Sequence, residues 1–168
     1  MIPARQDASG IFTGLVLETF RFNGRLLAAG DALTADLGLS SARWQVLGAL
    51  QLAGKPLTVP QIARNMGLTR QGVQRLADLL ADRGLMEFVD NPEHQRAKLL
   101  RLTARGRAAL ERIDRRQRRW AARMVRGLDR RALRDAYLVL RRLRERLEEE
   151  GDGASHSAVE ERANAQAG

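Results

Sequence analysis

The chain has 168 residues, enough for one domain or two small lobes, and its hydrophobic fraction of 44% includes only 4% aromatic residues, which favours a helical core of Leu, Ala, Val and Ile. It contains no cysteine, which excludes disulfides, cysteine zinc sites and thiol redox switches, and two histidines (His94 and His156) are too few for a metal centre without carboxylates. The net charge of +9 predicts attraction to a polyanion, although arginine-rich codon usage gives the same excess, so charge by itself identifies no partner.

Residues 1–10 carry no apolar signal segment, and no apolar run reaches the ~18 residues of a membrane span. We therefore expect a cytoplasmic protein with a disordered N-terminus over residues 1–10. A long amphipathic helix follows, which ends near Gly30. Its apolar residues recur at intervals of three and four: Phe12, Leu15, Val16, Phe22, Leu26 and Leu27.

The middle of the chain predicts a helix-turn-helix. A second helix begins after Ser40, a suitable N-cap, and stops at Gly54. The segment from Thr58 to Gln61 is a capping box with proline in the first turn, so a third helix starts there. Gly67 supplies the left-handed residue that ends it, and Thr69 caps a fourth helix.

The fourth helix has one apolar and one polar face, and Gly84 ends it. Val73, Leu76, Ala77 and Leu80 share the inner face, which leaves Gln71, Gln74, Arg75 and Asp78 outside. Two short apolar runs, residues 85–89 and 99–103, then predict a β-hairpin whose loop, residues 90–98, is polar and charged.

Two further amphipathic helices are expected. Thr103 caps a fifth helix that ends at Gly127, and Asp129 caps a sixth that carries leucines to Leu147. Residues 151–168 lack large apolar residues except Val159, which predicts a disordered tail.

A duplex major groove admits one helix, so a DNA-binding protein needs a helix that is anchored on one side and polar on the other. The predicted DNA-contacting residues are Thr69, Arg70, Gln71, Gln74 and Arg75 on the fourth helix, with Arg96 and Lys98 on the hairpin. An ordinary solvated face is the alternative for the helix. A basic hairpin placed after it, where it can enter the minor groove, favours DNA binding.

These segments resemble the MarR family of regulators. The resemblance rests on LTVPQIARNMGLTRQGVQRLADLLADRGLMEF (residues 57–88) and on DNPEHQRAKLLRLTARG (residues 90–106). Two positions depart from the family pattern. His94 replaces the acidic residue that would brace Arg96, so that Asp90 or Glu93 takes this part, and Gly72 stands where a side chain is usual.

The resemblance implies a mainly helical winged helix-turn-helix with a small β-hairpin wing and six helices. Residues 11–36 and 104–150 would form a dimerisation lobe, residues 37–103 the DNA-binding lobe, and the homodimer would bind an inverted repeat, usually as a repressor. Two amphipathic chain ends support a dimer, although packing within one chain would bury them as well.

The resemblance also implies a cleft between the lobes where a small aromatic or phenolic anion releases DNA. Trp44 would line this cleft, and Phe12 and Phe22 could approach it, although aromatic residues at helical spacing are usually core residues. No metal or cofactor is expected.

An enzyme and a non-specific DNA-binding protein are the two rival functions. No catalytic residues are predicted, because the sequence has no phosphate-binding glycine loop, nucleophile motif or metal-ligand spacing. A non-specific architectural DNA-binding protein is the stronger rival, since the fifth helix is dense in arginine from Arg112 to Arg126.

Overall fold

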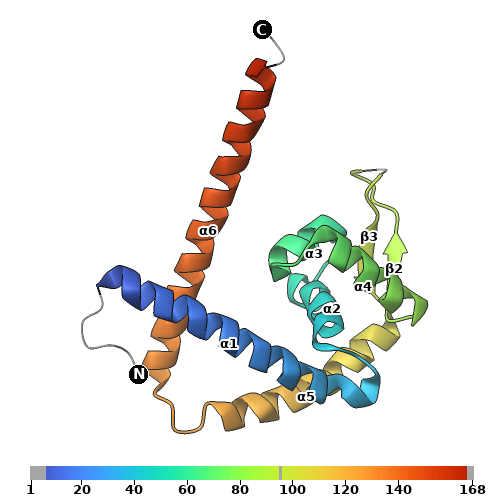
Figure 1. Cartoon of the computed structure of the whole chain (residues 1–168). Helices are drawn as coiled ribbons and strands as arrows, with labels where there is room; N and C mark the ends of the chain where they lie inside the picture. The colour runs from blue at the N-terminus through green and yellow to red at the C-terminus, as the bar shows by residue number, and fades with distance from the viewer. Residues whose placement is uncertain (1–6, 95, 166–168) are drawn as a thin grey trace. The chain divides into compact units, whose positions relative to one another are not determined.

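The computed structural model describes residues 7–94 and 96–165, with side chains up to Gly151 (Figure 1). Residue contacts divide the chain into two compact units, residues 1–121 and 122–168. The elements in chain order are α1 (Ala8–Thr34), the 3₁₀ helix η1 (Ala35–Leu37), α2 (Ser41–Ala53), β1 (Leu57–Thr58), α3 (Val59–Met66), α4 (Arg70–Asp82), β2 (Met86–Val89), β3 (Leu99–Leu102), α5 (Ala104–Met124) and α6 (Arg130–Ala165). In the described residues, no helix is both long enough and apolar enough to cross a membrane.

The helix boundaries around the helix-turn-helix follow the predicted caps. Thr58 and Gln61 form the reciprocal capping box at the start of α3. Gly67 ends α3 with a φ of 63°, in the left-handed region where a Cβ would be strained. The Thr69 hydroxyl accepts a hydrogen bond from the Gly72 amide at 3.1 Å and so caps α4. The tight turn between α3 and α4 is therefore confirmed.

The β-sheet has one strand more than predicted. Its order is β1-β3-β2 with both pairings antiparallel, and β1 pairs Leu57 with Leu100 and Thr58 with Leu99. From the sequence, Thr58 was predicted only as the cap of α3, and no strand was predicted before it. Two residues are too few to carry an alternating pattern, so this strand is defined by its partner.

The core of the first unit joins α2, α3, α4, the sheet and the first half of α5. Its largest fully buried apolar residues are Val46, Leu47, Ile62, Val73, Leu80, Met86, Leu100, Leu110 and Ile113. Each predicted helix of the helix-turn-helix thus places its inner face in one common cluster, which fixes α4 against the rest of the unit.

Gly30 lies inside α1, which continues to Thr34, so the predicted end near Gly30 is wrong. The glycine serves close packing instead: a Cβ there would lie 2.6 Å from the Ser41 hydroxyl oxygen on α2. The buried Thr34 hydroxyl, 2.9 Å from the carbonyl oxygens of Gly30 and Leu39, marks the real end of the helix.

In the second unit, α6 continues through Ala165, whereas the sequence predicted a disordered tail from residue 151. Alanine, glutamate and arginine recur after residue 153, and these residues favour a helix even without an apolar face. The absence of large apolar residues was therefore a poor guide to local backbone structure. Likewise α1 begins at Ala8, inside the predicted disordered N-terminus, of which residues 1–6 lie outside the described residues.

Candidate nucleic-acid interface and cavity

The two faces of α4 are separated as the sequence predicts. Val73, Ala77 and Leu80 have no exposed surface, and they anchor the helix to the core. Gln71, Gln74 and Arg75 are exposed on the opposite face. The helix therefore presents hydrogen-bonding side chains of the types that pair with adenine and guanine edges, on a rigid base.

The N-terminal end of α4 combines exposed donors with a tight cap. Thr69 and Arg70 are both exposed at this end. Unpaired backbone N–H groups of a first helical turn favour an anion, and a phosphate is the natural one in a DNA complex. Gly72 is half-buried, and a Cβ there would lie 2.9 Å from the Thr69 hydroxyl oxygen, so a side chain would press on the cap.

One member of the polar face is already held in place. The Gln74 side-chain amide donates a hydrogen bond of 2.8 Å to the Asp78 carboxylate, one helical turn further on. This contact uses one of the two amide N–H donors and leaves the amide oxygen available. Asp78 also puts a negative charge towards the C-terminal half of the face, which leaves the N-terminal half with Arg70 and Arg75 as the basic part.

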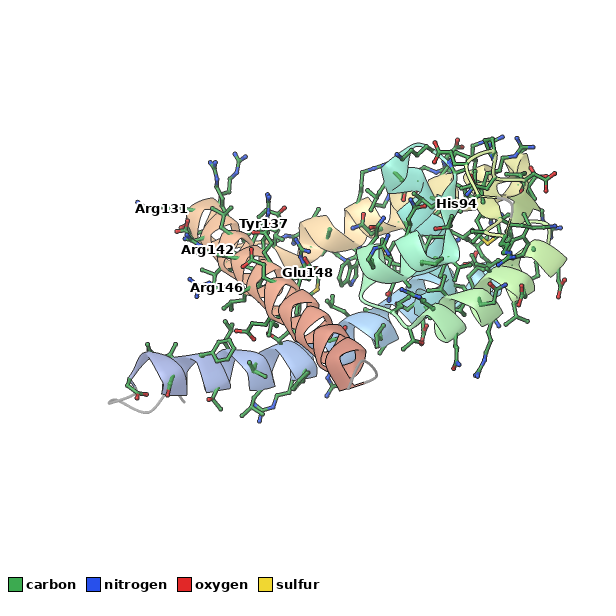
Figure 2. The ribbon with its side chains drawn as sticks, turned by 90° about the horizontal axis from the view of Figure 1, so that it is seen from above. His94, Arg131, Tyr137, Arg142, Arg146 and Glu148 are labelled. Carbon is green, nitrogen blue, oxygen red and sulfur yellow. The ribbon has the colours of Figure 1, made fainter. Side chains whose placement is uncertain are left out.

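The wing carries the two predicted cations on its exposed loop. Arg96 and Lys98 are exposed, and the loop is shaped by Asn91, whose side-chain oxygen accepts a hydrogen bond from the Glu93 amide at 3.1 Å. His94, labelled in Figure 2, is exposed at the wing. Gln95 lies outside the described residues.

The predicted brace of Arg96 is not found. Among the described residues, the ion pairs include none between Arg96 and either Asp90 or Glu93. His94 cannot replace the carboxylate that the family pattern has in this place, because an imidazole offers no negative charge to a guanidinium. Arg96 is therefore held less firmly by its neighbours than the motif suggested.

Thr103 and Gly106 join the base of the wing to α5. The Thr103 hydroxyl donates to the Gly84 carbonyl at 2.7 Å and accepts from the Gly106 amide at 3.0 Å. A Cβ on Gly106 would lie 1.9 Å from the Leu85 carbonyl oxygen. The glycine is thus required where the end of α4, the start of β2 and the start of α5 meet.

The linker between α1 and α2 is bound from two sides. The Arg83 guanidinium at the end of α4 donates to the carbonyl oxygens of Gly38 and Leu37. From α5, the Arg116 guanidinium binds the Asp36 carboxylate, with 2.6 Å between Nη2 and Oδ2. The hydrogen bond from Arg116 lowers the pKa of Asp36 below its ordinary value.

A cavity of about 550 Å³ lies among α1, α2 and α5 in the first unit. Its lining residues are Asn23, Leu26, Leu27, Gly30, Leu33, Ser41, Trp44, Gln45, Gly48, Gln51, Leu52, Met66, Asp114, Gln117 and Trp120. Trp44 lines this cavity, and its part in binding a ligand stays a prediction. The lining residues of α1 and α5 recur at three- to four-residue spacing, so each helix contributes one face.

Phe12 and Phe22 are not among the residues that line this cavity, so their approach to a ligand stays a prediction. Both are exposed on α1. Phe12 precedes Asn23, the first lining residue, by eleven positions, or roughly 16 Å of helix. Phe22 lies one helical turn before Leu26, a lining residue, and therefore on the same side of α1.

Three other side chains at the cavity were not predicted from the sequence. Trp120 lines it from α5. Asp114 and Gln51 are joined by a hydrogen bond of 2.8 Å between the Gln51 amide nitrogen and a carboxylate oxygen. The spacing of residues 114, 117 and 120 on one helix face was the available signal. In the described residues, no group of three or more His, Cys, Asp or Glu residues could hold a metal ion.

The helix-turn-helix has a buried inner face and, on α4, an exposed polar face, and an antiparallel wing follows it. Together these features define a winged helix-turn-helix DNA-binding protein. A family model described as MarR family matches residues 37–97. An uncharacterized protein of Mycobacterium tuberculosis is 44% identical over 102 residues, which cover 61% of this chain and 70% of that protein. This chain belongs to the MarR family, whose regulators are DNA-binding transcription factors rather than enzymes.

Solved structures agree with this assignment along most of the chain. The crystal structure of a MarR family transcription regulator superimposes with a TM-score of 0.71 at 26% identity, covering 84% of this chain and 95% of that one. The PcaV transcriptional regulator of Streptomyces coelicolor gives a TM-score of 0.62 at 26% identity, covering 74% of this chain and 89% of that one. The fold class predicted from the sequence, mainly helical with a small wing, is confirmed.

Proposed function

We propose that the protein is a sequence-specific transcriptional repressor that binds an inverted-repeat operator as a homodimer. In this proposal the N-terminal half of α4 enters the major groove, with Gln71, Gln74 and Arg75 at base edges and Thr69 and Arg70 at the backbone. Arg96 and Lys98 of the wing contact the adjacent minor groove. A dimer would place two α4 helices about one helical turn of DNA apart, and occupation of a promoter would block transcription.

The observation that carries the proposal is the two-sided character of α4. Its inner residues are fully buried, and its outer residues, which could hydrogen-bond to bases, are exposed next to a basic wing in the same compact unit. An exposed polar face by itself is common. A rigidly anchored polar helix followed by a basic hairpin meets the geometric demands of groove binding, which few other functions need.

The direct test is a gel-shift titration on fragments selected from a genomic DNA pool. Arg96→Ala is expected to weaken binding several-fold across all selected sequences, whereas Arg75→Ala is expected to relax the base preference at one position of each half-site. Arg142→Ala on α6 is the matched control, because it removes the same charge from the other unit. Undiminished binding by Arg96→Ala would reject the assignment of the wing.

The second candidate is a non-specific architectural protein that uses the arginines of α5. Part of this charge is already engaged, because Arg116 and Arg112 lie against Asp36, at 2.6 and 3.9 Å from one carboxylate oxygen. That engagement favours the specific regulator. Competition with random DNA separates the two, since a specific regulator keeps an affinity ratio of about 1,000 or more and an architectural protein does not.

The proposal includes a small aromatic effector that binds the cavity beside Trp44 and releases the protein from DNA. The PcaV structure, 26% identical to this chain, holds that protein's natural ligand and so supports a ligand-responsive regulator. A cavity of about 550 Å³ has the size of an ordinary small-molecule site. A thermal-shift screen of small aromatic compounds tests this part, because a ligand that binds the folded state raises its melting temperature.

A further inference from the structure

We infer that the cavity among α1, α2 and α5 selects an aromatic cation, such as an aryl-alkyl ammonium, and not the aromatic anion that the family resemblance implied. This inference rests on the proposed function only in assuming that the cavity binds a small aromatic molecule. It specifies the charge of that molecule from the side chains that line the cavity.

The charged side chains that line the cavity determine which ligand charge it favours. Asp114 is its single charged side chain, and the lining contains no lysine, arginine or histidine. The other polar side chains are neutral: Asn23, Ser41, Gln45, Gln51 and Gln117. A carboxylate ligand would enter a partly enclosed space beside a like charge, with no cation to compensate its lost hydration, whereas an ammonium would gain an opposite charge.

Asp114 is placed to accept a further donor. Its side chain is half-buried, and Gln51 donates to one carboxylate oxygen, Oδ2, at 2.8 Å. Within the described residues no hydrogen bond to the other oxygen, Oδ1, is present. A carboxylate offers about four acceptor positions, so a ligand ammonium can bind Asp114 without displacing Gln51.

The aromatic residues of the lining fit the same class of ligand. Trp44 comes from α2 and Trp120 from α5, and both are half-buried at the cavity. Indole is the side chain that attracts a cation over its face most strongly, and it also stacks on an aromatic ring. The ring and the ammonium of one ligand would therefore each find a partner.

The arginines of α5 do not reverse this preference. Arg115, Arg116 and Arg118 flank the lining residues on the helix but do not line the cavity, and Arg116 is bound to Asp36. At physiological salt, charges separated by more than about 8 Å are largely screened, so the group in contact with the ligand dominates. The basic surface affects the rate of approach more than the choice of ligand.

A second cavity has a lining of the opposite net charge. It has about 400 Å³ and shares Gln51 with the first cavity, and its charged lining residues are Lys55, Arg101, Arg107 and Glu111. Of these two cavities, one is lined by three cations and a carboxylate, and the other by a lone carboxylate. Glu111 lies on α5 one turn before Asp114, which makes it a matched control for the removal of a negative charge.

The experiment is a fluorescence titration of the full-length protein with three benzene probes of equal ring size: an aminomethyl cation, a hydroxymethyl neutral compound and a carboxylate. The chain has two tryptophans, and both line the cavity, so intrinsic emission reports directly on its occupancy. We expect saturable quenching by the cation at a concentration about tenfold lower than by the carboxylate.

The variants test the role of Asp114. Asp114→Asn keeps an acceptor for Gln51 and is expected to weaken binding of the cation about tenfold while leaving the neutral probe unchanged. Asp114→Glu should restore the preference for the cation, and Glu111→Gln should leave all three affinities unchanged. A melting curve for each variant checks that it is folded.

Three results would overturn the inference: tighter binding of the carboxylate, no saturable binding of the cation, or a cation affinity that Asp114→Asn does not alter. A gel shift on the selected operator then separates the two proposals. Cation binding that depends on Asp114 without release of DNA would support the ligand class and reject effector release. Release of DNA by the carboxylate probe alone would support effector release and reject the cation as the class of ligand.

Discussion

At the scale of single residues, Gly106 gives a structural reason for the last glycine of the family motif over residues 90–106. The sequence Leu-Thr-Ala-Arg-Gly (residues 102–106) closes the wing and opens α5. Thr103 bonds both Gly84 and Gly106, which draws the start of α5 against the chain between α4 and β2. The resulting approach leaves no room for a Cβ at residue 106, so the glycine is required by packing rather than by a turn.

We predict that Gly106→Ala destabilises the protein by about 1–3 kcal/mol or more, because the methyl group would have to displace the Leu85 backbone rather than a flexible side chain. The melting temperature should fall by several degrees. Gly14→Ala on α1 is the matched control, since no atom lies within 4 Å of the added Cβ. Alanine has the higher helix propensity there, so the control should melt at the same or a higher temperature.

At the scale of elements, the ion pair between Asp36 of η1 and Arg116 of α5 makes the stability of the protein depend on pH. Arg116 lowers the pKa of Asp36 mainly through their hydrogen bond. A carboxyl group with a lowered folded-state pKa contributes stability at any pH above its unfolded value, about 4, and loses that contribution as the pH falls through the folded value. The contribution is small, because both side chains are more than a third exposed.

We predict that Asp36→Asn flattens the acid limb of the stability curve. Between about pH 5 and pH 3 the melting temperature of the wild type should fall more steeply than that of the variant, and above pH 5 the variant should melt at a lower temperature. Asp135→Asn on α6 is the control, because its carboxylate lies 3.9 Å from an Arg131 side chain that is 90% exposed. Parallel curves for Asp36→Asn and the wild type would contradict the ion pair.

The elements also show how far the sequence could predict the structure. Caps such as Thr58, Thr69 and Thr103 act within three residues of themselves, so local pattern located the starts of α3, α4 and α5 correctly. Gly30 resembled a helix stop and is instead a point of contact with α2, which depends on a partner eleven residues away. Long-range contacts of this kind are invisible to a local pattern.

The candidate sites divide in the same way. The polar face of α4 was predictable, because helical periodicity alone assigns Gln71 and Arg75 to the side opposite Val73. The cavity was predictable only in part. Trp44 was found through the family resemblance, whereas the contact between Gln51 and Asp114 joins residues 63 positions apart in the chain. Only the folded backbone brings such a pair together.

At the scale of the whole molecule, large apolar side chains are exposed on helices of both units. On α1 these include Phe20, which is 69% exposed, and on α6 they include Tyr137, which is 61% exposed. The side chains labelled on α6 project away from the helix axis (Figure 2). Large apolar side chains that are exposed together on a surface often mark an interface. A second copy of the chain would cover them and would satisfy the proposed two-fold operator.

We predict that the protein is a dimer at micromolar concentration and that its dimerisation depends on α6. Light scattering should give twice the chain mass of 18.7 kDa. Leu140→Glu introduces a charge among the exposed apolar residues of α6, so it should shift the protein to the monomer. Binding to an operator with both half-sites should then weaken far more than binding to a single half-site, because the linked second contact is lost.

The dimer experiment needs a control variant for Leu140→Glu. Arg142→Glu also places a carboxylate on an exposed position of α6, two residues further on, but it replaces a polar side chain rather than an apolar one. A dimer in this control, together with a monomer for Leu140→Glu, would assign the effect to the apolar surface rather than to charge on the helix. A wild-type monomer at micromolar concentration would contradict the dimer, and the operator would then have no reason to be an inverted repeat.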